Sequence, residues 1–339
     1  MLSFKRPHDH PAYLEFMRPD ENHSVGLVYK HSESSVILYS FYYRCLNQSQ
    51  AFKNIGPCIH ITSPYGYGGP IFEGNEEERS DAEQEFIRLF KSELTKRNSV
   101  SEFVREDLFR RQIVNRNDGV LIEQQKNIVV HLNRAHDDIW TGYKHKVRKN
   151  VNRAKASNLK VVFDIEGEYL NEFVKIYHDT MRRTEAPSKF FIPKDKFHSL
   201  VDSLGQDGGL MFAHVFSGGR MVSTELLLRS QTVLFSCLGG TLEDAFDARP
   251  NDLLKHETIL WGSDNGYKHY VLGGGVQPND GIFKYKEAFD PDGITPFYIR
   301  KVIHNEKIYD QLVEARDLFE KKQNRIWSPN EEFFPKYLS

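Results

Sequence analysis

The chain has 339 residues, of which 39% are hydrophobic and 27% are charged, and its formal net charge is −2. Its length suits about two domains, and its composition is that of an ordinary globular protein. The nearly balanced charge argues against nucleic-acid binding driven by the charge of the whole chain. Any such contact would need a local basic patch.

The three cysteines, Cys45, Cys58 and Cys237, occur without a C-x-x-C pair or any spacing typical of metal ligands. We therefore expect free thiols in a reducing compartment and no metal site. The first residues lack the apolar core of a signal peptide, and no window approaches the roughly 18 apolar residues of a membrane-spanning helix. The predicted location is the cytoplasm, and contact with a membrane surface stays open.

The first part of the chain alternates strands with one helix. Val25–Tyr29 and Val36–Phe41 flank a short polar stretch, a pattern that predicts a β-hairpin. A helix is expected to begin within the acidic stretch Glu73–Glu85 and to end near Arg97, because apolar residues recur at helical spacing there. Further strands are expected at Ile59–Thr62, Val100–Val104 and Ile128–Leu132.

A glycine-rich loop, Ser63–Pro70, follows the strand that ends at Thr62 and contains Tyr65, Tyr67 and Gly68. Tyrosine offers a large contact area at a low cost in conformational entropy, so the loop is a candidate wall of a binding pocket. The alternative is a turn whose aromatic rings only cover a neighbouring core.

A long helix is predicted from Asp137 to about Ala156, because apolar residues recur three or four positions apart. Basic side chains accompany the apolar stripe, and bases near a helix C-terminus suit the helix dipole without any further role. Alternatively, some of them bind substrate phosphates, and the candidates are Arg148, Lys149 and Arg153.

The second half of the chain has an informative order of elements. Its strands are expected at Leu159–Ile165, Leu210–Phe216, Met221–Leu228, Thr232–Leu238, Tyr270–Leu272 and Phe297–Ile303, and its helices at Glu168–Met181, Lys194–Leu204, Asn251–Asp264 and Lys284–Phe289. The resulting order, β-α-α-β-β-β-α-β-α-β, matches the topology of the Gcn5-related N-acetyltransferases (GNAT), in which an acyl donor sits between splayed central strands. A closing helix, Glu306 to about Gln323, follows.

The stretch Tyr270–Phe289 is the candidate centre of the site. An apolar run ends in three glycines, of which Gly273 and Gly274 are candidates for substrate binding because glycine lets backbone N–H groups approach a ligand closely. Lys284 and Lys286 follow a polar turn and could meet an anionic substrate. A glycine-rich strand exit followed by a solvated helix is the alternative.

Three motifs in order resemble FemAB-type acyltransferases and span most of the chain. The first is the loop Ser63–Pro70, SPYGYGGP. The second begins at Trp140 and reads WxxYxxxxRKxxxRA. The third contains DNGY from Asp264, LGG from Leu272, and YKEAF, which ends at Phe289.

This resemblance implies an α+β protein with tandem GNAT-like domains and mixed, mostly antiparallel sheets. The expected domains are residues 1–136 and 137–304, with residues 305–339 forming a C-terminal helix and tail that pack back on the first domain. The implied reaction transfers an acyl or aminoacyl group to an amine or hydroxyl, with no tightly bound cofactor. In the peptidoglycan-bridge members the donor is aminoacyl-tRNA and the acceptor is a nucleotide- or lipid-linked muropeptide. Relatives acylate exopolysaccharide sugars with acyl-CoA.

Two departures from the family pattern concern the donor. The stretch Met181–Leu210 is too short for the helical arm found in some tRNA-dependent members. The glycine-containing pyrophosphate loop of CoA-dependent acetyltransferases is missing between Leu238 and Leu254. Arg249 and a helix start at Asn251 could still receive a phosphate there.

Acyl transfer needs a deprotonated nucleophile and a group that stabilises the developing oxyanion. Lys286 is the first candidate, facing either that oxyanion or an acceptor phosphate, with a surface lysine as the alternative. Glu225 lies in an otherwise apolar strand and is a candidate general base, unless it points outward or pairs with a base. A non-catalytic GNAT fold that binds a nucleotide-sugar or a protein is the alternative to an enzyme.

Overall fold

The computed structural model describes residues 6–109 and 113–339, which form two compact units. The mid-chain unit consists of Gln125–Pro296 and the described residues up to Phe16. The split unit consists of Met17–Gln124 and Phe297–Ser339. The expected domains, residues 1–136 and 137–304, follow one another along the chain. The two units instead interleave, because the chain passes from one unit to the other within strands β6 and β12.

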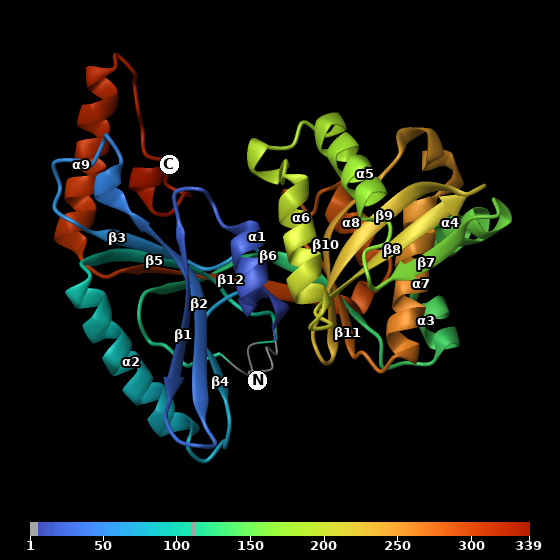
Figure 1. Ribbon diagram of the computed structural model, residues 1–339, viewed down its shortest axis with the longest axis horizontal. Helices are drawn as coiled ribbons and strands as arrows, with labels where there is room; N and C mark the ends of the chain where they lie inside the picture. Colours follow the sequence, from blue (N-terminus) through green and yellow to red (C-terminus); the bar gives the residue numbers. More distant parts are fainter. Residues whose placement is uncertain (1–5, 110–112) are drawn as a thin grey trace. The chain divides into compact units, whose positions relative to one another are not determined.

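The split unit contains a mixed sheet with the strand order β1-β2-β3-β5-β12, and β4 pairs with β2 (Figure 1). The pair β3–β5 is parallel, and the other pairs described within this unit are antiparallel. The antiparallel pair β1–β2 is the predicted hairpin, which is confirmed. The strands are β1 His23–Lys30, β2 Val36–Cys45, β3 Ile59–Thr62, β4 Ile71–Glu73, β5 Ser99–Arg105 and β12 Ile294–Ile303.

Two helices cover this sheet. Helix α2, Arg79–Lys96, buries Phe86, Phe90 and Leu94 against the sheet, because positions four residues apart share one helical face. Helix α9, Glu306–Lys322, belongs to the same unit and packs against β5. Its Tyr309 and Leu312 join a buried cluster with the C-terminal tail. Each such buried side chain contributes about 1.5–3 kcal/mol.

The sheet of the mid-chain unit has the order β6-β11-β10-β9-β8-β7. Its strands are β6 Val120–His131, β7 Lys160–Asp164, β8 Leu210–Ser217, β9 Arg220–Arg229, β10 Val233–Thr241 and β11 His269–Gly273. Its helices are α1 Pro11–Met17, α3 His136–Gly142, α4 His145–Ala156, α5 Leu170–Arg183, α6 Lys194–Leu200, α7 Pro250–Asp264 and α8 Gly281–Glu287. The predicted element order of this half is confirmed.

One predicted helix is two helices in the structure. The expected helix 137–156 breaks between α3 and α4, where Tyr143 has the extended backbone angles φ −65° and ψ 143°. The break lets the Tyr143 ring enter the core, where its hydroxyl lies 3.2 Å from Nδ1 of His256. Burial of the Tyr143 ring therefore accounts for the extended backbone at this residue. The spacing of apolar residues continues across the break, so it does not reveal where the helix ends.

Helices cover both faces of the mid-chain sheet (Figure 1). On one face, Val147 and Val151 of α4 and Leu253 of α7 belong to one hydrophobic cluster, which also contains Met211, Ala213 and Val215 of β8, Val222 and Leu227 of β9 and Leu234 of β10. On the other face, Phe173 of α5 packs edge-on against Phe212 of β8. Along β8, the alternation of side chains thus separates two cores.

The parallel strands β10 and β11 stay paired only at one end. Their register comprises Val233–His269, Leu234–Tyr270 and Phe235–Val271. After Phe235 the strand β10 continues to Thr241, with Cys237 as the extra residue of a bulge opposite β9. No further pair joins β10 to β11 within residues 6–109 and 113–339. Two neighbouring strands therefore diverge in the middle of the sheet.

Candidate functional site

The turn after β11 places the side chain of Lys286 beside the diverging strands. Gly273 has φ +75°, a left-handed conformation that glycine adopts without strain. The next residue, Gly274, accepts a hydrogen bond from Nζ of Lys286 at 2.7 Å. Asp280 caps α8 by accepting from the backbone N–H of Phe283 at 2.8 Å. The glycines and the cap together fix the lysine amine over the end of β11.

The surroundings of Lys286 favour its neutral form. Burial and, next, the positive charge of Lys255 lower the pKa of this amine to about 8, while Glu225 and Asp280 act in the opposite direction. A lysine with such a pKa is partly neutral near pH 7, as acid–base chemistry requires.

Glu225 lies in a buried polar cluster, here called the Glu225 cluster, made of Glu225, Ser236, Lys255 and Tyr270. Lys255 of α7 and Ser236 of β10 donate to Oε1 of Glu225, and the Tyr270 hydroxyl donates to Oε2 at 2.7 Å. Lys255 also lies 3.0 Å from the hydroxyl oxygens of Ser236 and Tyr270. Glu225 and Lys255 are 4% and 5% exposed. The carboxylate therefore points into the unit and is paired with a lysine.

Sequence reasoning missed Lys255 and Ser236, and it assigned no role to Tyr270 although this residue begins the stretch Tyr270–Phe289. Lys255 follows Leu253 and Leu254 and is four residues from Ile259, so its position on a buried helical face was visible in the spacing. The pairing of Lys255 with Glu225 could not be predicted from the sequence, because it depends on how α7 packs on β9.

The three basic candidates of α4 differ in their contacts. Arg148 donates to the carbonyl oxygens of Thr141, at 3.0 Å, and of Tyr143, so it closes the break between α3 and α4. Arg153 is half exposed and lies 3.8 Å from the carboxylate of Asp247. Lys149 is exposed, and no ion pair is found for it in the described part of the chain. Lys149 and Arg153 thus remain accessible to an anionic ligand.

Arg249 and Asn251 lie where α7 begins. Arg249 has φ +59°, and its Nε is buried without a hydrogen-bond partner among the residues described. Asn251 donates to the hydroxyl of Tyr285 at 2.9 Å, so it links the first turn of α7 to α8. The α4 and α7 helices lie side by side, as the 3.0 Å hydrogen bond from Asn150 to Asp252 shows. The helix that carries Lys149 and Arg153 therefore lies beside the first turn of α7.

The loop with Tyr65, Tyr67 and Gly68 belongs to the split unit, whereas the other predicted site residues belong to the mid-chain unit. Tyr67 is buried and packs edge-on against Phe297, with ring centres 5.7 Å apart. The N–H of Gly68 donates to the carbonyl of Arg105 at 2.6 Å. Tyr65 is 44% exposed. The loop therefore packs on the strand that ends at Arg105 and presents Tyr65 to solvent.

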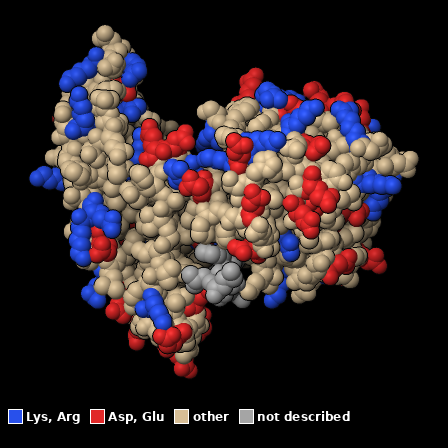
Figure 2. All heavy atoms as spheres, in the orientation of Figure 1, with Lys and Arg blue, Asp and Glu red and all other residues tan. Residues whose placement is uncertain are grey.

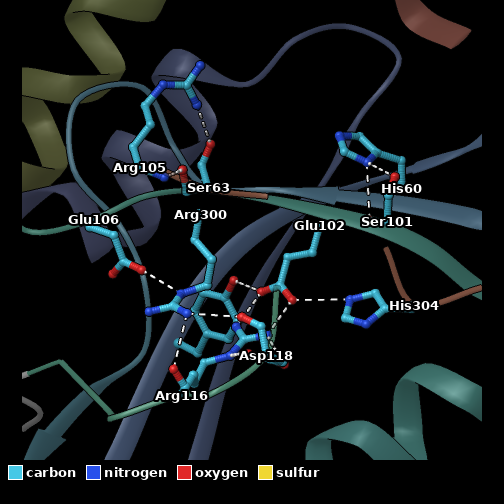
Figure 3. A network of polar contacts seen from close by, with 11 residues as sticks. His60, Ser63, Ser101, Glu102, Arg105, Glu106, Arg116, Asp118, Arg300 and His304 are labelled. Carbon is cyan, nitrogen blue, oxygen red and sulfur yellow. Dashed lines mark hydrogen bonds and ion pairs between the residues drawn. The ribbon is translucent and has the colours of Figure 1, made fainter. Parts of the chain in front are cut away.

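A second buried polar network lies in the split unit and was not singled out from the sequence (Figure 3). Arg116 donates from both terminal nitrogens to Glu102, at 2.7 Å each, and also pairs with Asp118 at 2.8 Å. Arg300 of β12 donates to Glu106 at 2.8 Å and to the carbonyl of Arg116 at 3.1 Å. These hydrogen bonds connect the segment that contains Arg116 and Asp118 to strands β5 and β12.

Other kinds of site find little support in the described residues. Within residues 6–109 and 113–339, no cluster of His, Cys, Asp and Glu has an arrangement suited to a metal ion. No helix in the same ranges combines the length and apolar character needed to cross a membrane. Figure 2 shows positive and negative side chains interspersed over the face in view. The two buried clusters and the α4 face are thus the features that a function has to explain.

One family model and several solved structures are similar to this chain. Residues 142–287, which contain Glu225, Lys255 and Lys286, match the family model of the acetyltransferase (GNAT) domain. The crystal structure of FemX is similar over 92% of this chain and 98% of its own, with a TM-score of 0.66 and 12% identity. A conserved protein of unknown function from Bacteroides thetaiotaomicron VPI-5482 is similar over 87% of this chain and 90% of its own, with a TM-score of 0.55 and 10% identity.

A third solved structure is the C-terminal domain (DUF2156) of a putative lysylphosphatidylglycerol synthetase from Agrobacterium fabrum. It is similar over 92% of this chain and 90% of its own, with a TM-score of 0.53 and 12% identity. No curated protein matches the chain.

The domain match identifies residues 142–287 as a GNAT acetyltransferase domain, and the chain as a whole shares the fold of FemX. The predicted fold class, α+β with tandem GNAT-like domains and mostly antiparallel mixed sheets, is confirmed. The matched residues also include the strands that diverge and the turn that holds Lys286.

Proposed function

We propose that this acyltransferase moves an acyl or aminoacyl group from acyl-CoA or aminoacyl-tRNA to an amine or hydroxyl of a sugar- or muropeptide-type acceptor. Such a reaction belongs to the synthesis of the cell envelope or of a polysaccharide. The observation that carries the proposal is the divergence of β10 from β11, with the amine of Lys286 fixed at the end of β11.

The diverging strands suit an extended donor. Beyond Phe235 the backbone of β10 is not paired with β11, so its N–H and C=O groups on that side are available to an amide-bearing chain. A thioester or ester carbonyl at the end of such a chain would lie near Lys286. Lys286 is therefore the residue that we assign to the reacting carbonyl.

The basic groups suit a substrate that carries phosphate. Lys149 and Arg153 are accessible on α4, and Arg249 has a buried donor without a partner in the described structure. All three lie on elements that meet at the N-terminus of α7, and a helix N-terminus favours anions. Both donor classes, and a nucleotide- or lipid-linked acceptor, bring phosphate to this region.

The solved relatives suggest that aminoacyl donors should be tested beside CoA. One of them is named as a putative lysylphosphatidylglycerol synthetase, a name that describes a lysyl group on a lipid. FemX shares the fold over almost its whole length. These similarities support, on fold alone, transfer of an aminoacyl group to an envelope component.

Donor choice and the role of Lys286 can be tested together. The protein is titrated calorimetrically with acetyl-CoA and, separately, incubated with aminoacyl-tRNA and a nucleotide-linked muropeptide, with product measured by mass spectrometry. We expect one donor to bind and react, and Lys286→Ala to lower kcat/KM by about 100-fold or more. Lys284→Ala is the matched control, because Lys284 is exposed on the same helix. Absence of transfer from both donors, or full activity of Lys286→Ala, would refute the proposal.

A further inference from the structure

The connection between β10 and α7 presents an aromatic ring to solvent. It contains the 3-10 helix Glu243–Ala248, and Phe246 within this helix is 41% exposed. The N–H of Ala245 donates to the carbonyl of Leu242 at 3.1 Å. The N–H of Arg249 donates to the carbonyl of Phe246, also at 3.1 Å. The ring therefore projects from a regular, hydrogen-bonded turn.

An arginine of α5 covers part of this ring. The guanidinium carbon of Arg183 lies over the Phe246 ring, 4.9 Å from its centre. The same side chain donates from Nη1 to the carbonyl of Thr241, the residue at which β10 ends, at 3.1 Å. Arg183 is itself exposed. Arg183 and Phe246 together are here called the Phe246 platform: two stacked planar groups, fixed to the end of β10 and open to solvent.

Cationic groups beside the platform suit the phosphate of a nucleotide. Arg249 follows Phe246 by three residues, which corresponds to one turn and about 6 Å of a 3-10 helix. Its Nε is buried and has no hydrogen-bond partner within residues 6–109 and 113–339. Arg153 of α4 reaches the same connection, where it lies 3.8 Å from Asp247. A base on the platform would therefore place its phosphate within reach of arginine donors.

The acids of the Glu243–Ala248 helix do not make this place repulsive to an anion. Its acidic residues are Glu243, Asp244 and Asp247. The arginines that contact or directly follow the helix are Arg153, Arg183, Arg220 and Arg249. Asp244 lies 2.8 Å from Arg220, and Asp247 faces Arg153. The arginines outnumber the acids by one, so the local charge is positive.

An exposed phenylalanine is ordinary by itself, and the combination around Phe246 sets it apart. Proteins bind nucleobases by stacking them on aromatic rings and on guanidinium planes, and both kinds of group meet in the platform. Arginine also engages phosphate through paired N–H groups. A planar base joined to a phosphate is thus the ligand that fits both features.

We propose that the Phe246 platform stacks the base of a nucleotide whose phosphate is bound by Arg249 and Arg153, and that this nucleotide is the adenosine end of the acyl donor. Both donor classes contain adenosine. CoA carries adenosine 3′,5′-bisphosphate, and every aminoacyl-tRNA ends in the adenosine that bears the aminoacyl ester. The inference rests on the proposed acyl transfer and adds Arg183 and Phe246 to the residues that bind the donor.

The first test uses nucleotides alone. The protein is titrated calorimetrically with adenosine 3′,5′-bisphosphate, with the trinucleotide CCA, and with ribose 5-phosphate, which has a phosphate and no base. We expect an adenosine ligand to bind at least about 5-fold more tightly than ribose 5-phosphate, because only the base can stack. Tighter binding of the bisphosphate assigns the platform to CoA, and tighter binding of CCA assigns it to aminoacyl-tRNA. Equal affinity for the base-free ligand, or no binding of either adenosine ligand, would overturn the proposal.

Substitutions at the ring show whether the base stacks there. Phe246→Ala should weaken binding of the adenosine ligand about 5- to 100-fold, and Phe246→Trp should restore it, because tryptophan keeps an aromatic face. Phe191→Ala is the matched control, since Phe191 is 37% exposed in the same unit, and it should bind like the wild type. Circular dichroism checks that the variants fold. Wild-type affinity of Phe246→Ala would place the ligand elsewhere and reject the platform.

Substitutions of the two arginines separate stacking from charge. Arg183→Lys keeps the positive charge and removes the planar guanidinium, so it should weaken binding of the adenosine ligand and leave that of ribose 5-phosphate unchanged. Arg249→Met removes a phosphate donor, so it should weaken both ligands. The opposite pattern, with Arg183→Lys affecting the base-free ligand alone, would contradict the assignment of the base to the platform.

Turnover then separates this inference from the proposed function. With a reactive donor, Phe246→Ala should raise the KM for that donor and change kcat by less than about 2-fold, as expected where binding of a group away from the reacting carbonyl is lost. If transfer occurs and the KM of Phe246→Ala is unchanged, the platform does not hold the donor and the acyltransferase assignment stands. If adenosine ligands bind through Phe246 but neither donor class reacts, the proposed reaction is wrong and the nucleotide site stands.

Discussion

Each unit contains one pair of parallel strands with a helix between them in the chain, and the two pairs differ in how far they stay together. In the mid-chain unit, β10 and β11 pair at three positions and then diverge. In the split unit, β3 and β5 pair from Ile59 to Thr62, and the contact continues through the backbone hydrogen bonds of Ser63 to Phe103 and Gly68 to Arg105. The first pair separates after three positions, whereas the second continues through backbone hydrogen bonds.

The buried charges follow the same division. The mid-chain unit surrounds Glu225 with groups that lie beside a lysine of lowered pKa. The split unit surrounds Glu102 with Arg116, Tyr39 and His304, and the Arg116 charge holds the pKa of Glu102 below its usual value. Each unit thus contains a buried carboxylate with a basic partner, and in the mid-chain unit this pair belongs to the proposed site.

The largest expected effect comes from breaking the closed network. Glu102→Ala leaves the buried guanidinium of Arg116 with only Asp118 as an ionic partner, so we expect the free energy of unfolding to fall by about 3–5 kcal/mol. Urea unfolding measures the change. Activity per folded molecule should stay near that of the wild type, because Glu102 and Lys286 belong to different units. A loss below about 1 kcal/mol would show that the network is not a source of stability.

Between pH 6.5 and pH 5, a smaller effect is expected from the buried His60. Burial lowers the pKa of its imidazole from 6.5 to about 3, while Nδ1 lies 2.9 Å from Oγ of Ser101. Between these two pH values the unfolded chain binds the proton and the folded chain does not. Stability should therefore fall as the pH drops from about 6.5 towards 3, by up to about 1.4 kcal/mol per pH unit from this residue.

The variant His60→Gln tests this origin of the pH dependence. Its amide can keep a hydrogen bond to Ser101 but does not titrate, so the free energy of unfolding should change less between pH 6.5 and pH 5 than in the wild type. Urea unfolding at the two pH values gives the slopes. Parallel slopes for both proteins would assign the pH dependence to other groups.

The smallest effect is expected at an exposed ion pair of the mid-chain unit. Arg220 and Asp244 lie 2.8 Å apart, and both side chains are about 60% exposed. Because water and salt screen such a pair, Asp244→Ala should change the free energy of unfolding by less than about 1 kcal/mol. Urea unfolding beside Glu102→Ala makes the contrast direct. A loss as large as that of Glu102→Ala would mean that burial does not set the difference.

Local patterns predicted much of this fold, and long-range packing accounts for what they missed. The strands and helices of the second half follow from apolar periodicity, and the glycines before Lys286 marked the turn that now positions its amine. Glu225 was visible as an acid among apolar residues. Its partner Lys255 was not visible, because 30 residues separate them and the pairing depends on the packing of α7.

Arg148 is a residue for which the sequence suggested a role that its tertiary contacts do not support. Its position within a basic stretch made it a candidate for phosphate binding, but its guanidinium closes the break between α3 and α4. That break follows from the burial of Tyr143, which periodicity does not register. Accessible charges such as Lys149 and engaged charges such as Arg148 look alike until the tertiary contacts are known.

The interleaving of the two units has a consequence for synthesis. A ribosome produces residues 17–124 before residues 125–296, but β5 receives its partner β12 only after Pro296 has been made. When β12 has emerged from the ribosome, the whole mid-chain unit has emerged before it and can fold, since domains generally fold as units. The split unit is therefore the last to be completed, and until then the edge of β5 that pairs with β12 is exposed to other chains.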